Sequence, residues 1–324
     1  MVNIPAGVIT ISASNVMKIA ILCNDRLGFP AIHQLIPHRL IVAVGTTNRV
    51  PETRIVLKQL CDQGTIPLHL FSNKDLEESL TKWLDQYQPD VVLVKTFPYK
   101  IPKSVLSIPK YGFINFHYAP LPGFRGSNPL FWMIRNGIKD GGVTIHKMDE
   151  SFDTGEILLQ HPVIMTPETN YGLAISQLAA TGAALTGNLL QGLLNNSLQS
   201  VQQDSSQATW YGRPTAEDLT IKWSEMNASE ICSLVNACNP WNKGAIVRYR
   251  GWIFALTDVS VSNLLVPQGT IPGTILAITE QEGLIISCKS DQAIRANVIY
   301  SEEGFFSGFR LKNFGITKGA RLDS

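Results

Sequence analysis

The chain has 324 residues, of which 44% are hydrophobic and 16% are charged, and its formal net charge at pH 7 is +1. This length predicts two domains, and this balance predicts a folded protein with a large core and excludes a disordered chain. Because the net charge is close to zero, the chain as a whole lacks the basic character that DNA binding needs, and we expect no DNA partner.

The cysteines and the N-terminal residues bear on the cellular compartment. Five cysteines are dispersed without the spacing of a zinc site, which favours reduced thiols in the cytoplasm: Cys23, Cys61, Cys232, Cys238 and Cys288. Residues 1–16 lack the charged start and cleavage site of a signal peptide, and no apolar run approaches the ~20 residues that span a bilayer. We therefore expect a cytoplasmic protein without a membrane partner. Met17 is a candidate for the native start, with residues 1–16 as an extension or an extra edge strand.

The first part of the chain alternates apolar runs with amphipathic stretches, which predict strands and helices respectively. The strands are expected at Lys18–Cys23, Leu40–Gly45, Pro67–Phe71, Asp90–Phe97 and Gly112–His117, and the helices at Phe29–Leu35, at Ile55–Gln63 and after an N-cap at Ser72 or Asn73. This alternation predicts an α/β fold with a doubly wound, mostly parallel sheet. No Gly-x-Gly-x-x-Gly follows the first strand, which counts against a dinucleotide site.

The remaining elements predict a second, smaller domain rich in strands. A helix is expected at Asn128–Asn136, strands near Val143–Met148 and Ile157–Met165, a long helix from Pro167 to about Asn195, a Ser- and Gln-rich linker around Ser197–Gln207, a helix at Ala228–Cys238, and strands at Ala245–Tyr249, Trp252–Val261, Gly273–Ile278, Gly283–Cys288 and Ala293–Tyr300. Five short strands at such spacing predict a small barrel. We expect residues 1–200 to form one domain with a core from about residue 17, residues 201–212 a linker, and residues 213–324 the second domain.

Asn115 and His117 end an apolar run and precede a Pro/Gly-rich loop. Alternation along a strand puts these two side chains on one face and turns Phe116 into the core. Ligands of α/β proteins bind where such strands end. The pair suits acyl chemistry, because an imidazole accepts a proton from an attacking amine and an amide donates to an oxygen that gains negative charge. Downstream, Asp153 lies in an acidic turn that ends at Gly155, where its carboxylate can orient the imidazole.

Together these segments resemble the 10-formyltetrahydrofolate-dependent formyltransferases, whose active site contains an Asn, a His and an Asp in this order. The family pattern reads here as Asn115, His117, Leu121-Pro122, Arg125-Gly126, Pro129, Val143-Thr144 and Asp153-Thr154-Gly155. Val16 to about Ser200 resembles the catalytic domain, and Thr209–Leu322 resembles the C-terminal domain of two-domain members. The resemblance implies formyl transfer from 10-formyltetrahydrofolate without a metal, with Asn115, His117 and Asp153 as catalytic residues, and an OB-like fold for the second domain.

The resemblance also implies binding residues for the folate. Two segments are similar to those whose backbones contact the pterin ring: one comprises Tyr99, Lys100 and Ile101, and the other comprises Asp149, Glu150, Ser151 and Phe152. The third segment is the proline-containing loop, with Ala119, Pro120, Leu121 and Pro122. Arg125 is a candidate for contacting an anionic substrate group, or else it clamps its own loop. His146 either faces the substrate or has a structural role.

The acceptor is expected to be a small amine, such as an amino sugar nucleotide or a specialised metabolite. The tRNA enzymes of the family carry an extended basic loop after the second strand, whereas residues 45–54 are short and contain only Arg49 and Arg54 as basic residues. His146 in Val-Thr-Ile-His also resembles the amino-sugar branch more than the tRNA branch. Three alternatives remain: a methionyl-tRNA formyltransferase, a formyltetrahydrofolate hydrolase, and a non-catalytic folate or nucleotide binder. Trp241 and Trp252 are assigned to packing in preference to base stacking.

Overall fold

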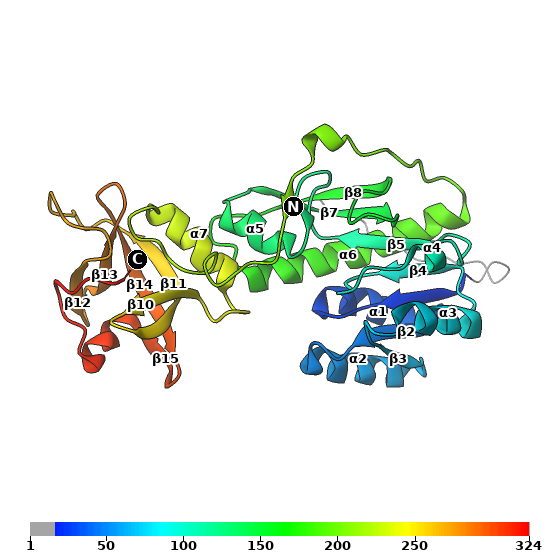
Figure 1. Ribbon diagram of the computed structural model, residues 1–324, viewed down its shortest axis with the longest axis horizontal. Coiled ribbons are helices and arrows are strands. Elements are labelled where there is room, and N and C mark those ends of the chain that lie inside the picture. The colour runs from blue at the N-terminus through cyan, green and yellow to red at the C-terminus, as the bar shows by residue number, and fades with distance from the viewer. Residues whose placement is uncertain (1–16, 324) are drawn as a thin grey trace. The chain divides into compact units, whose positions relative to one another are not determined.

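A computed structural model of the protein describes residues 17–323. These residues form two compact units, each assembled from separate parts of the chain (Figure 1). The first unit combines residues 17–126, 140–164 and 175–210, and the second combines residues 127–139, 165–174 and 211–323. The extension or edge strand expected over residues 1–16 lies outside the described residues.

Seven strands form the sheet of the first unit, in the order β3-β2-β1-β4-β5-β7-β8. Neighbouring strands from β3 to β5 are parallel, and β7 and β8 are added in antiparallel pairings. The bounds are β1 Ile19–Leu22, β2 Ile41–Thr47, β3 Leu68–Phe71, β4 Val91–Val94, β5 Phe113–His117, β7 Asp140–Lys147 and β8 Ile157–Ile164. The mostly parallel, doubly wound sheet predicted from the sequence is confirmed.

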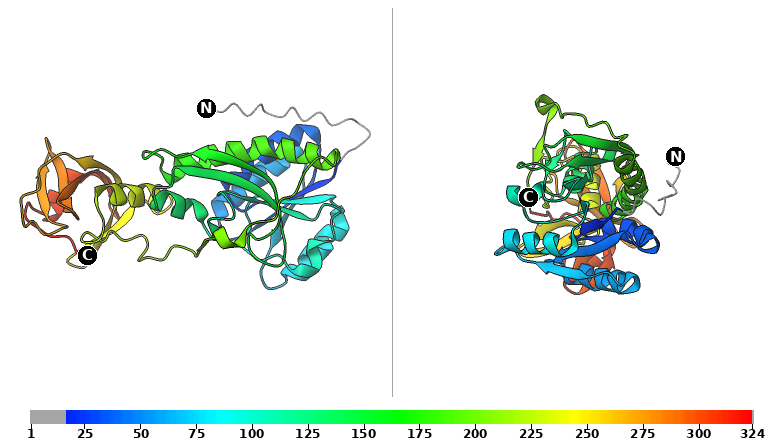
Figure 2. Two further views of the ribbon diagram at one scale, coloured as in Figure 1. Left: turned by 90° about the horizontal axis from the view of Figure 1, so that it is seen from above. Right: turned by 90° about the vertical axis from the view of Figure 1, so that its right-hand side faces the viewer.

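Helices cover both faces of this sheet (Figure 1, Figure 2). On one face, α3 packs Leu80 and Trp83 into a core cluster that includes Val92 of β4. On the other face lies α6, whose Thr186 accepts a hydrogen bond from Lys95 at the end of β4. The bounds are α1 Phe29–Leu35, α2 Pro51–Gly64, α3 Leu76–Tyr87, α4 Lys103–Leu106 and α6 Tyr171–Leu194. The sheet is therefore packed on both faces at β4, and Phe113 of the neighbouring strand β5 belongs to the same core cluster as Leu80.

Two helices begin later than predicted. Helix α3 begins after Asp75 instead of the predicted caps Ser72 or Asn73, because the Asp75 carbonyl accepts the first helical N–H bond. Helix α6 begins at Tyr171, although Pro167 was expected to open it. The physical reason is a cap at Asn170, whose side chain accepts a backbone N–H three residues further on.

Helix α6 is long and apolar enough to cross a membrane by length and composition. The expectation that no apolar run approaches this length is therefore wrong. However, 61% of its most apolar window is buried inside the protein. Leu178 and Leu189, for example, are fully buried. This burial is that of a core helix of a folded protein.

The second unit is built around an antiparallel sheet in the order β10-β11-β14-β13-β12, with β15 paired to β14. The bounds are α5 Pro129–Arg135, α7 Ala228–Cys238, β10 Ala245–Tyr249, β11 Trp252–Ser262, β12 Ile275–Thr279, β13 Gly283–Cys288, β14 Gln292–Ser301 and β15 Gly304–Ser307. Helix α7 packs against β11 and against α5. The smaller strand-rich second domain predicted from the sequence is confirmed, and its sheet is antiparallel.

The end of the chain joins the two edges of this antiparallel sheet. Arg321 bridges Thr274, which immediately precedes β12, and Asp323 bridges Arg248 of β10. Leu322 between them is buried. The C-terminal residues thus cover edge strands whose backbone groups would otherwise be unpaired.

Three short strands were not predicted. One of them is β15. The other two, β6 Arg125–Gly126 and β9 Trp210–Tyr211, pair with each other. Strand β9 lies within the stretch of residues 201–212 that was expected as a linker. Strands β6 and β9 have two residues each, too few for alternation to be recognised from sequence.

Candidate active site

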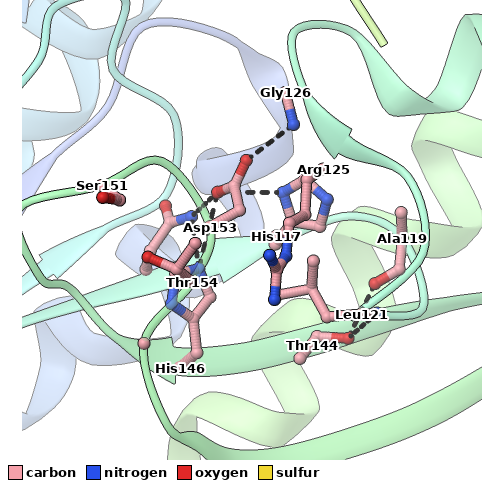
Figure 3. Close-up of polar contacts among 12 residues, drawn as sticks. His117, Ala119, Leu121, Arg125, Gly126, Thr144, His146, Ser151, Asp153 and Thr154 are labelled. Carbon is pink, nitrogen blue, oxygen red and sulfur yellow. Dashed lines mark hydrogen bonds and ion pairs between the residues drawn. The ribbon is translucent and has the colours of Figure 1, made fainter. Parts of the chain in front are cut away.

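Strand β5 places Asn115 and His117 on one face of the sheet, with Phe116 between them turned to the opposite face. Phe116 is buried, and its ring centroid lies 3.1 Å from Lys95 Nζ. The antiparallel neighbour β7 pairs His146 with Asn115 and Thr144 with His117. The alternation predicted from the sequence therefore brings an amide and two imidazoles together at the end of β5 (Figure 3).

Asp153, in the connection between β7 and β8, brings its carboxylate to these side chains. Its Oδ1 lies 3.4 Å from His117 Nδ1 and accepts a hydrogen bond of 3.3 Å from the Asn115 amide. Its Oδ2 accepts the backbone N–H of Gly126 at 2.9 Å. The Asp153 side chain is 11% exposed. The predicted convergence of an Asn, a His and an Asp is present in the structure.

Steric crowding explains why the third residue of the Asp-Thr-Gly sequence, Gly155, is a glycine. A Cβ on Gly155 would lie 1.9 Å from the carbonyl oxygen of Lys147, so no larger residue fits against β7. Asp153 itself adopts a left-handed backbone with φ of 56°. A non-glycine residue in this region costs about 1–2 kcal/mol and must be held by its surroundings.

The hydrogen bonds of His117 favour the protonated ring. Nε2 lies 2.8 Å from the Phe124 carbonyl oxygen, and Nδ1 faces the Asp153 carboxylate. Both partners are acceptors, so both ring nitrogens are in positions to donate. Burial, the largest single influence, lowers the pKa of His117, but the charge of Asp153 and the hydrogen bonds to Asp153 and to the Phe124 carbonyl together outweigh it, and the pKa is raised above its ordinary value. Burial likewise opposes the charged form of Asp153, yet attraction to His117 and the hydrogen bonds from its neighbours together hold the pKa of this carboxyl well below its usual range.

His146 is buried and contacts the other site residues. Its Nδ1 lies 2.8 Å from the Lys147 carbonyl oxygen and donates to it, which leaves Nε2 as an acceptor for the Asn115 amide at 3.1 Å. The same Nε2 is 3.6 Å from Asp153 Oδ1. Of the two roles considered for His146, this geometry accounts for a structural one, because the ring orients the amide of Asn115.

Thr144 holds the loop that follows β5. Its hydroxyl donates to the Ala119 carbonyl at 2.7 Å and accepts the backbone N–H of Leu121 at 3.1 Å. Gln160 of β8 donates to the Leu121 carbonyl and to the Thr144 hydroxyl, both at 2.9 Å. Ala119 and Leu121 are buried. The threonine of the Val-Thr motif therefore fixes the proline-containing loop beside the site.

Arg125 is buried and directed into the protein. Its guanidinium donates two hydrogen bonds to Gln203 Oε1, at 2.7 and 3.2 Å, and lies 5.4 Å from the ring of Trp210. Gln203 in turn donates to the carbonyls of Asp153 and Gly155. These contacts account for Arg125 as a clamp of its own loop. Sequence reasoning missed Gln203, because it lies in the Ser- and Gln-rich stretch expected to be a linker.

The two segments expected to contact the pterin lie beside one another. Lys100 places its ammonium 5.9 Å from the ring of Phe152, and Lys103 forms an ion pair with Glu150. Phe152 is 54% exposed. In the second segment, Asp149 accepts hydrogen bonds from the Ser151 N–H and from the Thr154 hydroxyl. In the first segment, Tyr99 packs against the core of the sheet and Ile101 is buried.

Among residues 17–323, no group of three or more His, Cys, Asp and Glu side chains is arranged to hold a metal ion.

A buried imidazole joined by a partly buried carboxylate and amide at a strand end of an α/β sheet suits an enzyme of the acyl-transfer class. Residues 36–185 match the family described as Formyl transferase, and residues 214–304 match the family Formyl transferase, C-terminal domain. A protein of Clostridium botulinum named methionyl-tRNA formyltransferase is 30% identical over 84% of this chain and 88% of its own. The chain therefore belongs to the formyl transferase family and is a formyltransferase.

Solved structures share the fold. WlaRD, a sugar 3N-formyl transferase crystallised in the presence of dTDP and 5-N-formyl-THF, has a TM-score of 0.64 at 16% identity, over 86% of this chain and 97% of WlaRD. HypX from Aquifex aeolicus in complex with tetrahydrofolic acid has a TM-score of 0.63 at 18% identity, over 94% of this chain. The match spans 48% of the HypX chain.

Proposed function

We propose that this formyltransferase moves the formyl group of 10-formyltetrahydrofolate to a primary amine by direct attack, without a covalent enzyme intermediate. The observation that carries the proposal is the convergence of Asn115 and His117 on Asp153 Oδ1, at 3.3 and 3.4 Å. The match to the formyl transferase family supports a formyl donor. The folates named with two structures of the same fold, 5-N-formyl-THF with WlaRD and tetrahydrofolic acid with HypX, agree with this choice.

In the proposed reaction the amine attacks the formyl carbon and the formyl oxygen gains negative charge. In the proposed complex the formyl oxygen replaces two present acceptors, His146 Nε2 for the Asn115 amide and the Phe124 carbonyl for His117 Nε2–H, so that both groups donate to the oxygen that gains charge. Asp153 keeps the ring charged and oriented. The imidazolium then gives a proton to the departing folate nitrogen, and the ring recovers a proton from the attacking amine, directly or through water. One proton leaves the amine and one reaches the folate, so the step is balanced.

We propose that the folate lies against the three segments named from the family resemblance. They are Tyr99–Ile101, Ala119–Pro122 and Asp149–Phe152. Their support is that the first and last segments are in contact through Lys100 and Phe152, and that Thr144 fixes the middle one beside His117. The five free cysteines support a cytoplasmic location, which remains part of the proposal.

For the acceptor, we propose methionyl-tRNA first, in place of the small amine expected from the sequence. Proteins of Clostridium botulinum and Clostridium perfringens with this named activity are 30% identical to the chain over 84–85% of its length. The sugar formyltransferase structure is only 16% identical, so that likeness bears on the fold alone. The sequence relatives are the stronger support.

A small amine stays the second candidate because of one structural feature. Strand β2 ends at Thr47 and helix α2 begins at Pro51, so only three residues connect them. The one basic residue among them, Arg49, places its guanidinium 4.9 Å from the ring of Tyr99. Such a loop offers few charges for neutralising tRNA phosphates.

Consumption of 10-formyltetrahydrofolate with different acceptors tests the proposal. The acceptors are methionyl-tRNA, uncharged tRNA, a nucleotide-linked amino sugar, and none. Consumption with methionyl-tRNA alone supports the first proposal, and consumption with the amino sugar alone supports the second. Formate release without any acceptor identifies a hydrolase. Folate binding without turnover in any arm contradicts the catalytic proposal.

A further inference from the structure

Gln203 is the hydrogen-bonding link between Arg125 and the loop that carries Asp153. Its Oε1 accepts two bonds from the Arg125 guanidinium, at 2.7 and 3.2 Å. Its Nε2 donates to the carbonyls of Asp153, at 2.9 Å, and Gly155, at 2.7 Å. The two ends of one amide are thus both engaged, and they join three parts of the chain that are far apart in sequence.

The position of this amide matters because Asp153 is in a left-handed backbone conformation. The carbonyl that Gln203 holds belongs to Asp153 itself, so the bond fixes the peptide from which the carboxylate projects. The second bond, to Gly155, fixes the other side of the turn. Without these two donors, the carbonyls on both sides of the turn lose their partners, and the turn can relax toward a less strained backbone.

Arg125 makes Gln203 a better donor. The guanidinium is buried and carries a permanent charge, and its bonds to Oε1 are charge-assisted. Polarisation of the amide by this charge strengthens the two bonds that Nε2 donates. Arg125 also belongs to β6, whose next residue, Gly126, donates its N–H to Asp153 Oδ2. Backbone and carboxylate of Asp153 are therefore both tied to the same two-residue strand.

We propose that Gln203 is a positioning residue of the active site: it holds the Asp153 carboxylate against His117 and thereby keeps the imidazole protonated. The proposal deepens the function proposed above and rests on it for its catalytic consequence. Its electrostatic consequence, the raised pKa of His117, stands without any knowledge of the acceptor. When the Gln203 amide is removed, Asp153 withdraws and the buried ring of His117 loses its stabilising charge.

The test compares Gln203→Met with Gln202→Met. Gln202 is the adjacent residue; it is exposed and donates to Glu156. Its substitution therefore makes the same chemical change one residue away and leaves the contacts of the site in place. The first readout is the titration of the His117 ring by NMR, with its signal assigned by its loss in His117→Gln. We expect a lower His117 pKa in Gln203→Met and an unchanged one in Gln202→Met.

The second readout is kinetic. We expect kcat of Gln203→Met to fall about 10²-fold with a smaller change in the KM for the folate, as for a misplaced catalytic group. Gln203→Asn provides a second variant in case Gln203→Met does not fold, because its amide is one methylene too short to join Arg125 to both carbonyls. A folded variant of either kind with the wild-type His117 titration overturns the proposal. Failure to find an acceptor leaves the titration decisive, which separates this test from that of the proposed function.

Discussion

Asp153→Asn removes the charge that stabilises the His117 imidazolium and keeps the shape of the side chain. The distance from Asp153 Oδ1 to His117 Nδ1 is 3.4 Å. At an effective dielectric constant of about 20, Coulomb's law gives about 5 kcal/mol for this pair. This is an upper bound, because the charged groups also lose hydration. Since each 1.36 kcal/mol is tenfold in rate, and the amide retains a hydrogen bond, we expect kcat to fall about 10²- to 10³-fold.

The pH dependence of Asp153→Asn follows from the raised pKa of His117. In the wild type the pKa of the ring is raised above the ordinary value of 6.5, because the charge and hydrogen bond of Asp153, together with the hydrogen bond to the Phe124 carbonyl, outweigh burial. In the variant the charge of Asp153 is gone, and burial, the largest remaining influence, lowers the pKa of His117. The alkaline limb of kcat/KM should therefore move to lower pH.

The assay is formyl transfer measured from pH 5 to pH 10. The control is Asp85→Asn, the same substitution at an exposed aspartate of α3 that belongs to none of the segments assigned to the site. A wild-type rate and pH profile in Asp153→Asn, with the control also unchanged, would refute the role of the carboxylate.

Three further outcomes are expected. Thr144→Val leaves the Leu121 N–H and one Gln160 N–H without an acceptor, so the KM for the folate should rise about tenfold in steady-state kinetics; an unchanged KM contradicts the loop assignment. Gly155→Ala should lower the free energy of unfolding in urea by about 1–3 kcal/mol, because its Cβ meets the Lys147 carbonyl, and wild-type stability contradicts this. The Asp153–His117 pair stabilises the fold fully between pH 3.8, the ordinary pKa of an aspartate, and pH 6.5, the ordinary pKa of a histidine. This stabilisation is lost as the pH rises through the raised pKa of His117. The difference in urea stability between wild type and Asp153→Asn should thus be larger at pH 5 than at pH 9, and equal differences contradict the pair.

The sequence alone located the three central side chains because their signals are local. Asn115 and His117 are two residues apart on a strand, so alternation settles that they share a face. Asp153 is marked by the glycine two residues later, which the close approach of the Lys147 carbonyl requires. The mostly parallel sheet followed in the same way from the alternation of strands and helices.

What the sequence did not indicate depends on contacts between distant residues. Gln203 lies 50 residues from Asp153, and no periodic pattern surrounds it. The closure of the antiparallel sheet by Arg321 and Asp323 involves isolated bridges, not a strand. The apolar character of α6 was underestimated because small and polar residues interrupt its apolar run, although the helix itself was expected and is slightly shorter than predicted.

The most direct test of the account is formyl transfer by His117→Ala, measured together with its Kd for the folate. The control is His33→Ala, since His33 is an exposed histidine on α1. If His117 carries the chemistry, the variant binds folate with nearly wild-type affinity and transfers the formyl group at least about 10²-fold more slowly, while the control is unaffected. Full transferase activity in His117→Ala would contradict the account.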